Sequence, residues 1–171
     1  KDSKGILWFG ALGGYLTAYD GSSFKKYDET SGIKHRFILC IEEDKHGNLW
    51  FGSYGGGLYK FNGTEFINYN VEHGLSSPSP YAIVADADNR IWIGTTNGID
   101  RFDANTFTFR HYGKDEGFFG VETNPNAICL DKSSKIWFGT IVGAVKFDPS
   151  EDKMNRTEPL TSISGLQTFL K

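Results

Sequence analysis

The chain has 171 residues, of which 39% are hydrophobic and 15% aromatic, enough for a packed core. Its net charge of −3 and the lack of any basic run argue against a nucleic-acid partner. No apolar run approaches the ~20 residues that a membrane helix needs, so we expect no membrane segment within this sequence.

A four-residue motif recurs along the chain and contains every tryptophan of the sequence. Its copies are Leu7–Gly10, Leu49–Gly52, Ile91–Gly94 and Ile136–Gly139, with Trp8, Trp50, Trp92 and Trp137 at the second position and Gly10, Gly52, Gly94 and Gly139 at the fourth. The tryptophans are spaced by 42, 42 and 45 residues. A period of about 40–50 residues with short strands indicates a β-propeller or another repeat array. We interpret these residues as structural, and the tryptophan row as core between repeats rather than a platform for sugars.

Each repeat predicts four short antiparallel strands, which is the content of one propeller blade. The second copy shows the pattern in full, with strands expected at 38–43, 49–53, 58–61 and 66–69. A polar turn that starts at Asp44 links the first two strands, and its counterparts start at Asp86 and Asp131. Because the aspartate recurs in successive turns, it indicates a structural carboxylate that accepts backbone N–H bonds, not a catalytic group.

The first and last copies are predicted to be incomplete. The segment 2–5 aligns with the turn at 44–47, so the sequence begins inside a blade, after the position of its innermost strand. The last copy has predicted strands at 126–130, 135–140 and 144–147. Counts of three, four, four and three strands predict an all-β partial propeller of about four blades over residues 1–150, a fragment of a larger ring. Residues 151–171 are expected to form a linker and a terminal strand, either the outer strand of the last blade or the start of a following domain.

Groups that suggest catalysis or metal binding are few. No His-x-x-x-His or Cys-x-x-Cys spacing occurs, so we expect neither a metal site nor a cofactor. Cys40 and Cys129 fall in inner strands of blades two apart, which predicts two free, buried thiols rather than a disulfide. The four histidines are expected in turns, in connections between blades and in an outer strand, and we interpret each as a solvated surface residue. They are His35, His46, His73 and His111.

The most variable segments of the repeats suggest a binding face. In a propeller, the connections between blades and the turns between second and third strands share one face, and here these segments differ in every copy. Variable loops on a rigid scaffold are the usual place for binding. Their aromatic and polar side chains suit a carbohydrate or another polar oligomer. The candidate ligand-binding residues are Arg36, Phe37, Tyr54, Tyr81, Glu122, Asn124 and Asn126.

The stretch Gly47–Ser53, followed by Gly56–Phe61, resembles the two-component regulator propeller repeat, and the likeness covers about residues 1–149. Such repeats build the extracytoplasmic sensor regions of hybrid two-component histidine kinases, which carry two propellers and an immunoglobulin-like domain before the membrane helix and the kinase. The resemblance implies the periplasmic part of an inner-membrane protein, with oligosaccharides as signals. It also implies that this chain lacks kinase activity and that residues 151–171 lead into the immunoglobulin-like domain.

Three functions stay open on the sequence. The first is a ligand-sensing segment without catalysis, the second a scaffold for protein–protein interaction, and the third a propeller lyase or glycosidase. The third requires paired carboxylates that face the channel, and none is evident outside the repeating turns. Open blade faces at both ends further predict that the isolated chain forms a homodimer, end to end, with about eight blades in its ring.

Overall fold

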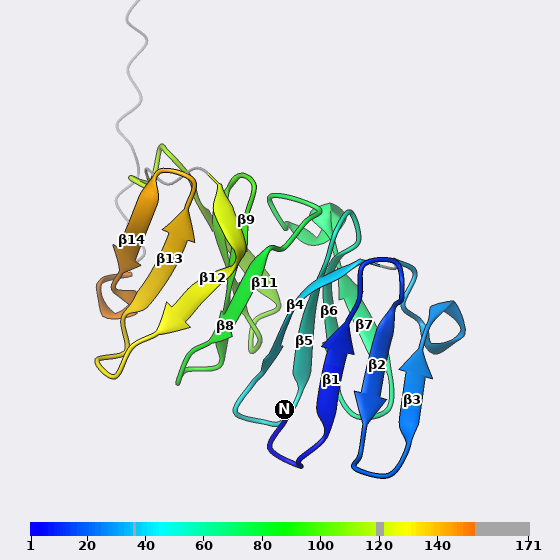
Figure 1. Ribbon diagram of the computed structural model, residues 1–171. Coiled ribbons are helices and arrows are strands. Elements are labelled where there is room, and N and C mark those ends of the chain that lie inside the picture. The colour runs from blue at the N-terminus through cyan, green and yellow to red at the C-terminus, as the bar shows by residue number, and fades with distance from the viewer. Residues whose placement is uncertain (36, 119–121, 153–171) are drawn as a thin grey trace, which may run out of the picture.

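Antiparallel strands in four separate sheets make up the computed structural model of this protein, which describes residues 1–35, 37–118 and 122–152 (Figure 1). We call the sheets blades 1 to 4. The strands are β1 (Leu7–Gly10), β2 (Leu16–Tyr19) and β3 (Phe24–Tyr27) in blade 1; β4 (Ile38–Glu43), β5 (Leu49–Ser53), β6 (Gly57–Phe61) and β7 (Phe66–Tyr69) in blade 2; β8 (Ala82–Ala85), β9 (Arg90–Thr95), β10 (Gly98–Asp103) and β11 (Thr108–Tyr112) in blade 3; and β12 (Thr123–Leu130), β13 (Ile136–Thr140) and β14 (Gly143–Phe147) in blade 4. The all-β fold and the predicted three, four, four and three strands are confirmed.

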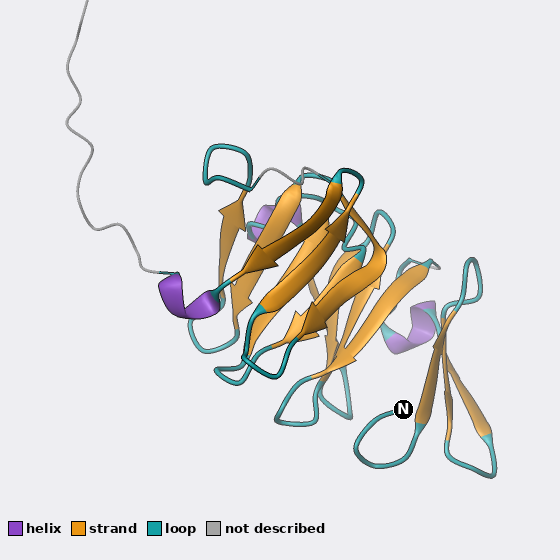
Figure 2. Ribbon diagram, turned by 60° about the vertical axis from the view of Figure 1, so that its left-hand side comes forward, coloured by secondary structure: helices purple, strands orange, loops and turns teal. Residues whose placement is uncertain are grey.

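Helical structure in this part of the chain is limited to three short 3-10 turns (Figure 2). They are η1 (Glu29–Ser31), η2 (Val71–His73) and η3 (Pro149–Glu151). Across the described residues, no helix has the length and apolar character needed to cross a membrane. The linker and terminal strand expected at 151–171 lie, from residue 153 onwards, outside the described residues.

A turn aspartate and the tryptophan six residues later are joined in every blade. In blade 2 the Asp44 carboxylate accepts the backbone N–H groups of His46 and Asn48, both at 2.9 Å, and the indole N–H of Trp50 at 2.9 Å. The indole bond satisfies the one polar atom of a large apolar side chain, so the tryptophan can enter the core. The structural role expected of the turn carboxylate is confirmed, whereas the indole bond was not anticipated. The other three pairs are Asp2–Trp8 at 2.9 Å, Asp86–Trp92 at 2.8 Å and Asp131–Trp137 at 2.8 Å.

Each tryptophan between two blades contacts aromatic rings of both. Trp50 lies over Tyr69 of its own blade, with ring centroids 6.1 Å apart, and packs against Phe102 of blade 3 at 5.5 Å. The same pattern repeats for Trp8 with Tyr27 (5.5 Å) and Phe61 (5.7 Å), and for Trp92 with Tyr112 (5.8 Å) and Phe147 (4.8 Å). Since Trp50 and Trp92 are fully buried, the interpretation of these residues as core is confirmed.

The two end blades depart from this pattern. Trp137 of blade 4 keeps its bond to Asp131 but is 38% exposed, because no described residues form a further blade over it. The core interpretation is therefore wrong for Trp137. On blade 1, Phe9 is 47% exposed, whereas its equivalents Phe51 and Phe138 are fully buried.

The glycine two residues after the tryptophan is required by close packing. A Cβ atom on Gly52 would lie 2.4 Å from the Cys40 sulfur and 2.6 Å from the Pro80 carbonyl oxygen of the next blade. Both distances are well inside van der Waals contact, so a larger side chain would force the blades apart. Gly10 and Gly94 meet the following blade in the same way, and Gly139 meets Ala127 of its own blade.

The two cysteines differ in their surroundings. Both thiols are free, as expected, and Cys40 is buried between blades 2 and 3, where burial raises the pKa of its thiol to about 12. Cys129 is exposed, so the expectation that it is buried is wrong. It stands two residues before Asp131, as Val84 does before Asp86, and that position faces the following blade. In blade 4 no described blade follows.

Candidate functional site

The connections between blades and the turns between second and third strands meet at one end of the molecule, at the top of Figure 1, as the sequence predicted. The backbone N–H of Tyr54, in the turn after β5, donates to the Phe37 carbonyl at 2.9 Å. In blade 4, the N–H of Ile141 donates to the Glu122 carbonyl at 3.1 Å. In blades 2 and 4, these bonds therefore join the turn after the second strand to the connection that enters the same blade. We call this end the upper rim.

Three predicted ligand-binding residues from three blades come together on the upper rim. Tyr81, which precedes β8, is partly buried, and its N–H donates to the Gly94 carbonyl at 2.8 Å. Partial burial raises the pKa of the Tyr81 phenol, and the nearby Tyr54 phenol and Glu122 carboxylate raise it further. The phenol therefore stays a neutral hydrogen-bond donor well above neutral pH. The two phenols and the carboxylate thus lie near enough on the rim to influence one another electrostatically.

Asn126 joins the inner strands of three blades. Its backbone N–H donates to the Tyr81 carbonyl at 2.9 Å, and its side-chain amide donates to the Leu39 carbonyl of β4 at 3.1 Å. Its φ of 55° lies in the left-handed region, which asparagine tolerates better than most residues. Beside it lies a groove of about 310 Å³. The groove is lined by Gly10, Ile38, Leu39, Cys40, Ile41 and Asn126.

The remaining predicted residues fall in different places. Phe37 is 44% exposed beside Tyr54, so it belongs to the upper rim. Asn124 is exposed on β12. Arg36 lies outside the described residues. The structure therefore brings together Phe37, Tyr54, Tyr81, Glu122 and Asn126.

Three exposed apolar side chains lie in the predicted binding turns but were not among the predicted ligand-binding residues. Leu12 is 78% exposed, Ile141 61% and Val142 70%, and all three lie in turns between the second and third strands. A large apolar residue at the tip of a polar turn is the signal that reveals them. With Tyr54 and Phe37 they give the rim an apolar outer surface.

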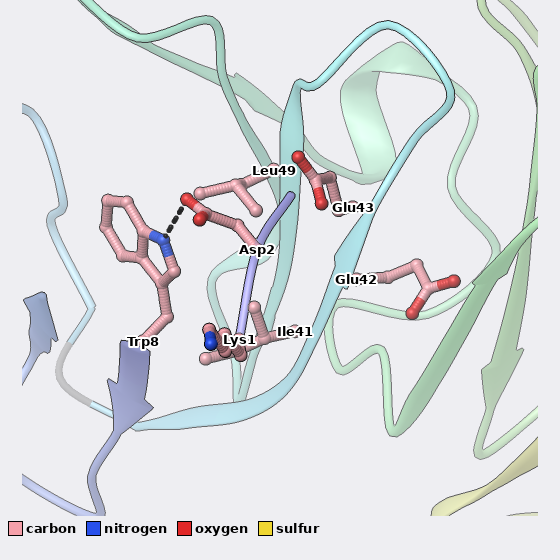
Figure 3. A pocket seen from close by; sticks show the side chains of 7 residues that line it. All are labelled: Lys1, Asp2, Trp8, Ile41, Glu42, Glu43 and Leu49. Atoms are coloured by element: carbon pink, nitrogen blue, oxygen red, sulfur yellow. Dashed lines mark hydrogen bonds between the residues drawn. The ribbon is translucent and has the colours of Figure 1, made fainter. Parts of the chain in front are cut away.

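A pocket of about 370 Å³ lies at the opposite end of the molecule, between blades 1 and 2 (Figure 3). The carboxylates that line this pocket already accept hydrogen bonds from other groups of the protein. The Glu43 carboxylate accepts the N–H and the hydroxyl of Ser3, at 2.7 and 2.6 Å, and Asp2 accepts the indole N–H of Trp8. Glu42 points away from Glu43 and accepts the Ala85 N–H of blade 3 at 3.4 Å, and burial raises the pKa of its carboxyl. The two adjacent glutamates therefore do not form a carboxylate pair of the kind that glycoside hydrolysis uses.

Two histidines are structural, so the interpretation of all four as solvated surface residues is wrong for them. His35 is half-buried, with Nδ1 3.1 Å from the Tyr59 hydroxyl. His111 Nδ1 lies 2.8 Å from the carboxylate of the fully buried Asp100, which also accepts the Ser76 hydroxyl. His46 and His73 are exposed. Within residues 1–35, 37–118 and 122–152, no group of three acidic, histidine or cysteine side chains is placed to hold a metal ion.

Two segments of the repeat region match a known protein family. Residues 32–55 and 74–97 match the family model described as two component regulator propeller. These two segments are therefore similar to two-component regulator propeller repeats. The matched segments run from the connection that enters a blade to the turn after its Trp-x-Gly strand, in blades 2 and 3. A comparison with curated proteins found no match.

Solved structures show how much of such a protein this propeller segment represents. The extracellular domain of a putative hybrid two-component system from B. thetaiotaomicron superposes with a TM-score of 0.80 at 25% identity, over 87% of this chain and 21% of that one. A second such domain from the same organism gives 0.72 at 24% identity, over 89% and 22%. Virginiamycin B lyase from Staphylococcus aureus shares the fold, with a TM-score of 0.62 at 19% identity over 85% and 53%. The chain thus spans about a fifth of the sensor domains it matches.

Proposed function

We propose that this chain is a segment of the extracytoplasmic sensor region of a membrane-anchored hybrid two-component histidine kinase. We further propose that its upper rim binds a polar ligand, and that oligosaccharides are the class of ligand that suits the rim best. Support for the sensor assignment comes from the matched repeats and from the likeness to the B. thetaiotaomicron extracellular domain. In this proposal the chain recognises and does not catalyse, and kinase output belongs to other parts of the parent protein.

The observation that carries the ligand proposal is the meeting of Tyr54, Tyr81 and Glu122 from three consecutive blades. Tyr54 is 57% exposed, so its ring is free to lie against the apolar face of a sugar. The Tyr81 phenol donates hydrogen bonds, and the Glu122 carboxylate accepts them from hydroxyl groups. Backbone hydrogen bonds hold Tyr54 to Phe37, Tyr81 to Gly94 and Glu122 to Ile141, which limits the conformational entropy lost on binding.

Titration calorimetry of the 171-residue chain with a panel of neutral and acidic oligosaccharides tests this proposal. We expect one class to bind saturably, with affinity reduced at least tenfold by Tyr54→Ala and less by Tyr81→Phe, which removes only a hydroxyl. Phe107→Ala is the matched control, since Phe107 is 64% exposed in the turn between β10 and β11, away from the rim. Absence of saturable binding across the panel, or equal loss in the control, would overturn the proposal.

A second function, the docking of a protein partner, is favoured by the apolar tips of the rim. Ile141 and Val142 are neighbouring exposed apolar residues at one loop tip, and contiguous exposed apolar surface marks interaction sites. If the ligand function is right, Leu12→Ser and Val142→Ser leave oligosaccharide binding unchanged. If the wild-type chain binds no sugar but captures other domains of the parent protein, and these two variants lose that capture, the partner function replaces the ligand function.

A further inference from the structure

The outer strands of blade 3 place two arginines opposite each other. Arg101 of β10 and Arg110 of β11 are direct partners in the antiparallel register. At the same position of the repeat, blade 2 has Lys60 opposite Ile67, so it brings only one cation to this place. Like charges directly opposite on neighbouring strands destabilise a sheet. The arginine pair of blade 3 therefore needs an anion beside it, which its counterpart in blade 2 does not.

The carboxylate of Asp152 supplies that anion. Asp152 follows η3, beyond the last strand of blade 4, and its side chain is only 2% exposed. Its Oδ1 atom lies 2.8 Å from Nη1 of Arg110, and its Oδ2 atom pairs with Nη1 of Arg101. Ion pairs of this kind are charge-assisted hydrogen bonds, which are stronger than neutral ones. One buried carboxylate thus bridges two guanidinium groups of the neighbouring blade.

Groups around the two arginines give the site its shape. The Arg110 guanidinium lies over the Tyr112 ring, 4.9 Å from its centroid, and this stacking orients its donors. Burial raises the pKa of the Tyr112 phenol, and the Asp152 carboxylate raises it further, so the phenol stays neutral. The Nε atom of Arg101 is buried and has no hydrogen-bond partner among the described residues. Three side chains that carry hydrogen-bond donors therefore lie around one carboxylate.

We propose that Arg101, Arg110 and Tyr112 form a binding site for a carboxylate group, and that Asp152 occupies it and thereby fastens residues 148–152 to blade 3. Blades 3 and 4 already pack through Tyr112 and Phe147, whose ring centroids lie 5.2 Å apart. The carboxylate contact adds a link that depends on charge. The path of the chain after blade 4 is thus fixed by the neighbouring blade, independently of any ligand on the upper rim.

Removal of the carboxylate and its replacement by free formate test the binding site. Asp152→Ala leaves a space of about the size of a carboxylate between the two arginines. This variant should lower Tm by several degrees, because removal of one partner leaves the charges of the other uncompensated. Sodium formate should restore most of the loss, and sodium chloride at the same ionic strength should not. Asp152→Asn, whose amide group fills the same space, should lose stability without responding to formate.

Asp88→Ala is the matched control for these measurements. The Asp88 carboxylate also pairs with an arginine, Arg90, at 2.8 Å, but its side chain is 73% exposed. Exposed ion pairs contribute little to stability. This variant should therefore keep the Tm of the wild type and show no response to formate.

Arg110→Ile separates the site from a general effect of salt, since isoleucine is the residue that blade 2 has at this position. With Asp152 present, the substitution should lower Tm, because the carboxylate loses one of its two arginines. Combined with Asp152→Ala, it should instead raise Tm above that of Asp152→Ala alone, because it removes the repulsion between the arginines. The double variant should not respond to formate.

Hydrogen exchange followed by mass spectrometry tests whether the site fastens residues 148–152. The N–H groups of Glu151 and Asp152 donate to the carbonyls of Asp148 and Pro149, at 3.1 and 3.4 Å. We expect these amides to exchange at least about tenfold faster in Asp152→Ala, because local opening becomes easier. Formate should restore Tm but leave this exchange fast, since a free carboxylate fills the site without holding the chain.

Three outcomes would overturn the proposal. If Asp152→Ala is folded by circular dichroism and its Tm does not respond to formate, the arginines do not form a carboxylate site. A loss of stability on Arg110→Ile in both backgrounds would lead to the same conclusion. Equal exchange of the amides of residues 149–152 in wild type and Asp152→Ala would show that Asp152 does not fasten this segment.

Discussion

Trp50 and Trp137 occupy the same position of the repeat and make the same hydrogen bond, yet one is fully buried and the other 38% exposed. The difference comes from outside their own blades. Blade 3 covers Trp50 with Phe102, and no described residue covers Trp137 in that way. The comparison shows that a blade determines the conformation of its own residues, whereas the adjacent blade determines how much those residues contribute to stability. This is expected for a repeat protein, because its stability depends on contacts between neighbouring repeats.

The largest expected effect separates these two tryptophans directly. Trp50→Ala should lower the free energy of unfolding by about 3–5 kcal/mol, because it empties a large buried aromatic site. Trp137→Ala should lower it by less than about 1 kcal/mol in the monomer, since water already contacts much of the ring. Urea denaturation at a concentration low enough to keep the chain monomeric measures both. Equal losses at the two positions would contradict this account of the interfaces.

The next effect concerns the glycines of the same motif. Gly52→Ala places a Cβ atom against the Cys40 sulfur and the backbone of Pro80, and should cost about 3 kcal/mol, at the upper end of the range for overpacking. Gly139→Ala meets only Ala127 of its own blade, at 2.8 Å, and should cost clearly less. Thermal unfolding of both variants checks the order. A larger loss for Gly139→Ala would show that the next blade does not impose the requirement for glycine.

Much of the fold could be predicted because the same sequence motif recurs in each blade. The Trp-x-Gly motif and the polar turn before it predicted the strands of blade 2 within one residue, and those of blade 4 within one residue except for the start of β12. The exposure of Trp137 and Cys129 could not be predicted in this way. Similarity between repeats does not reveal which copy has a neighbouring blade among the described residues, and burial depends on that neighbour.

The site was predictable only in part, for a related reason. Leu39, Tyr81 and Asn126 occupy one repeat position, five residues before the turn aspartate, and a comparison of the three copies would have shown how that position varies. The contact between Asp100 and His111 follows from strand pairing, since the two residues are direct partners between β10 and β11. Reading the histidine alone, without its cross-strand partner, led to the wrong interpretation.

A smaller effect is expected at the turn aspartates. Asp44→Ala leaves the buried Trp50 indole N–H and two backbone N–H groups without their acceptor, which should cost about 2 kcal/mol. Asp131→Ala removes the same bonds in blade 4, where water can replace the carboxylate, so its effect should be much weaker. Chemical denaturation of both variants tests the difference. If Asp131→Ala were the more destabilising, the aspartate would act through its turn and not through the buried indole.

The smallest expected effect is the response of this bond to acid. Burial alone would raise the pKa of Asp44, but hydrogen bonds from Trp50, Asn48 and the turn backbone outweigh it and hold the pKa below its ordinary value. A carboxyl whose pKa is lower in the folded state adds stability above its unfolded pKa of about 4 and loses that stability as pH falls through the folded value. The free energy of unfolding should therefore decline below about pH 4, and less steeply in Asp44→Asn, which has no proton to take up at this position. The decline is small because a protonated carboxyl still offers an oxygen to the Trp50 indole. Unfolding curves between neutral and acidic pH measure it, and an identical slope in wild type and Asp44→Asn would place the acid sensitivity at other carboxylates.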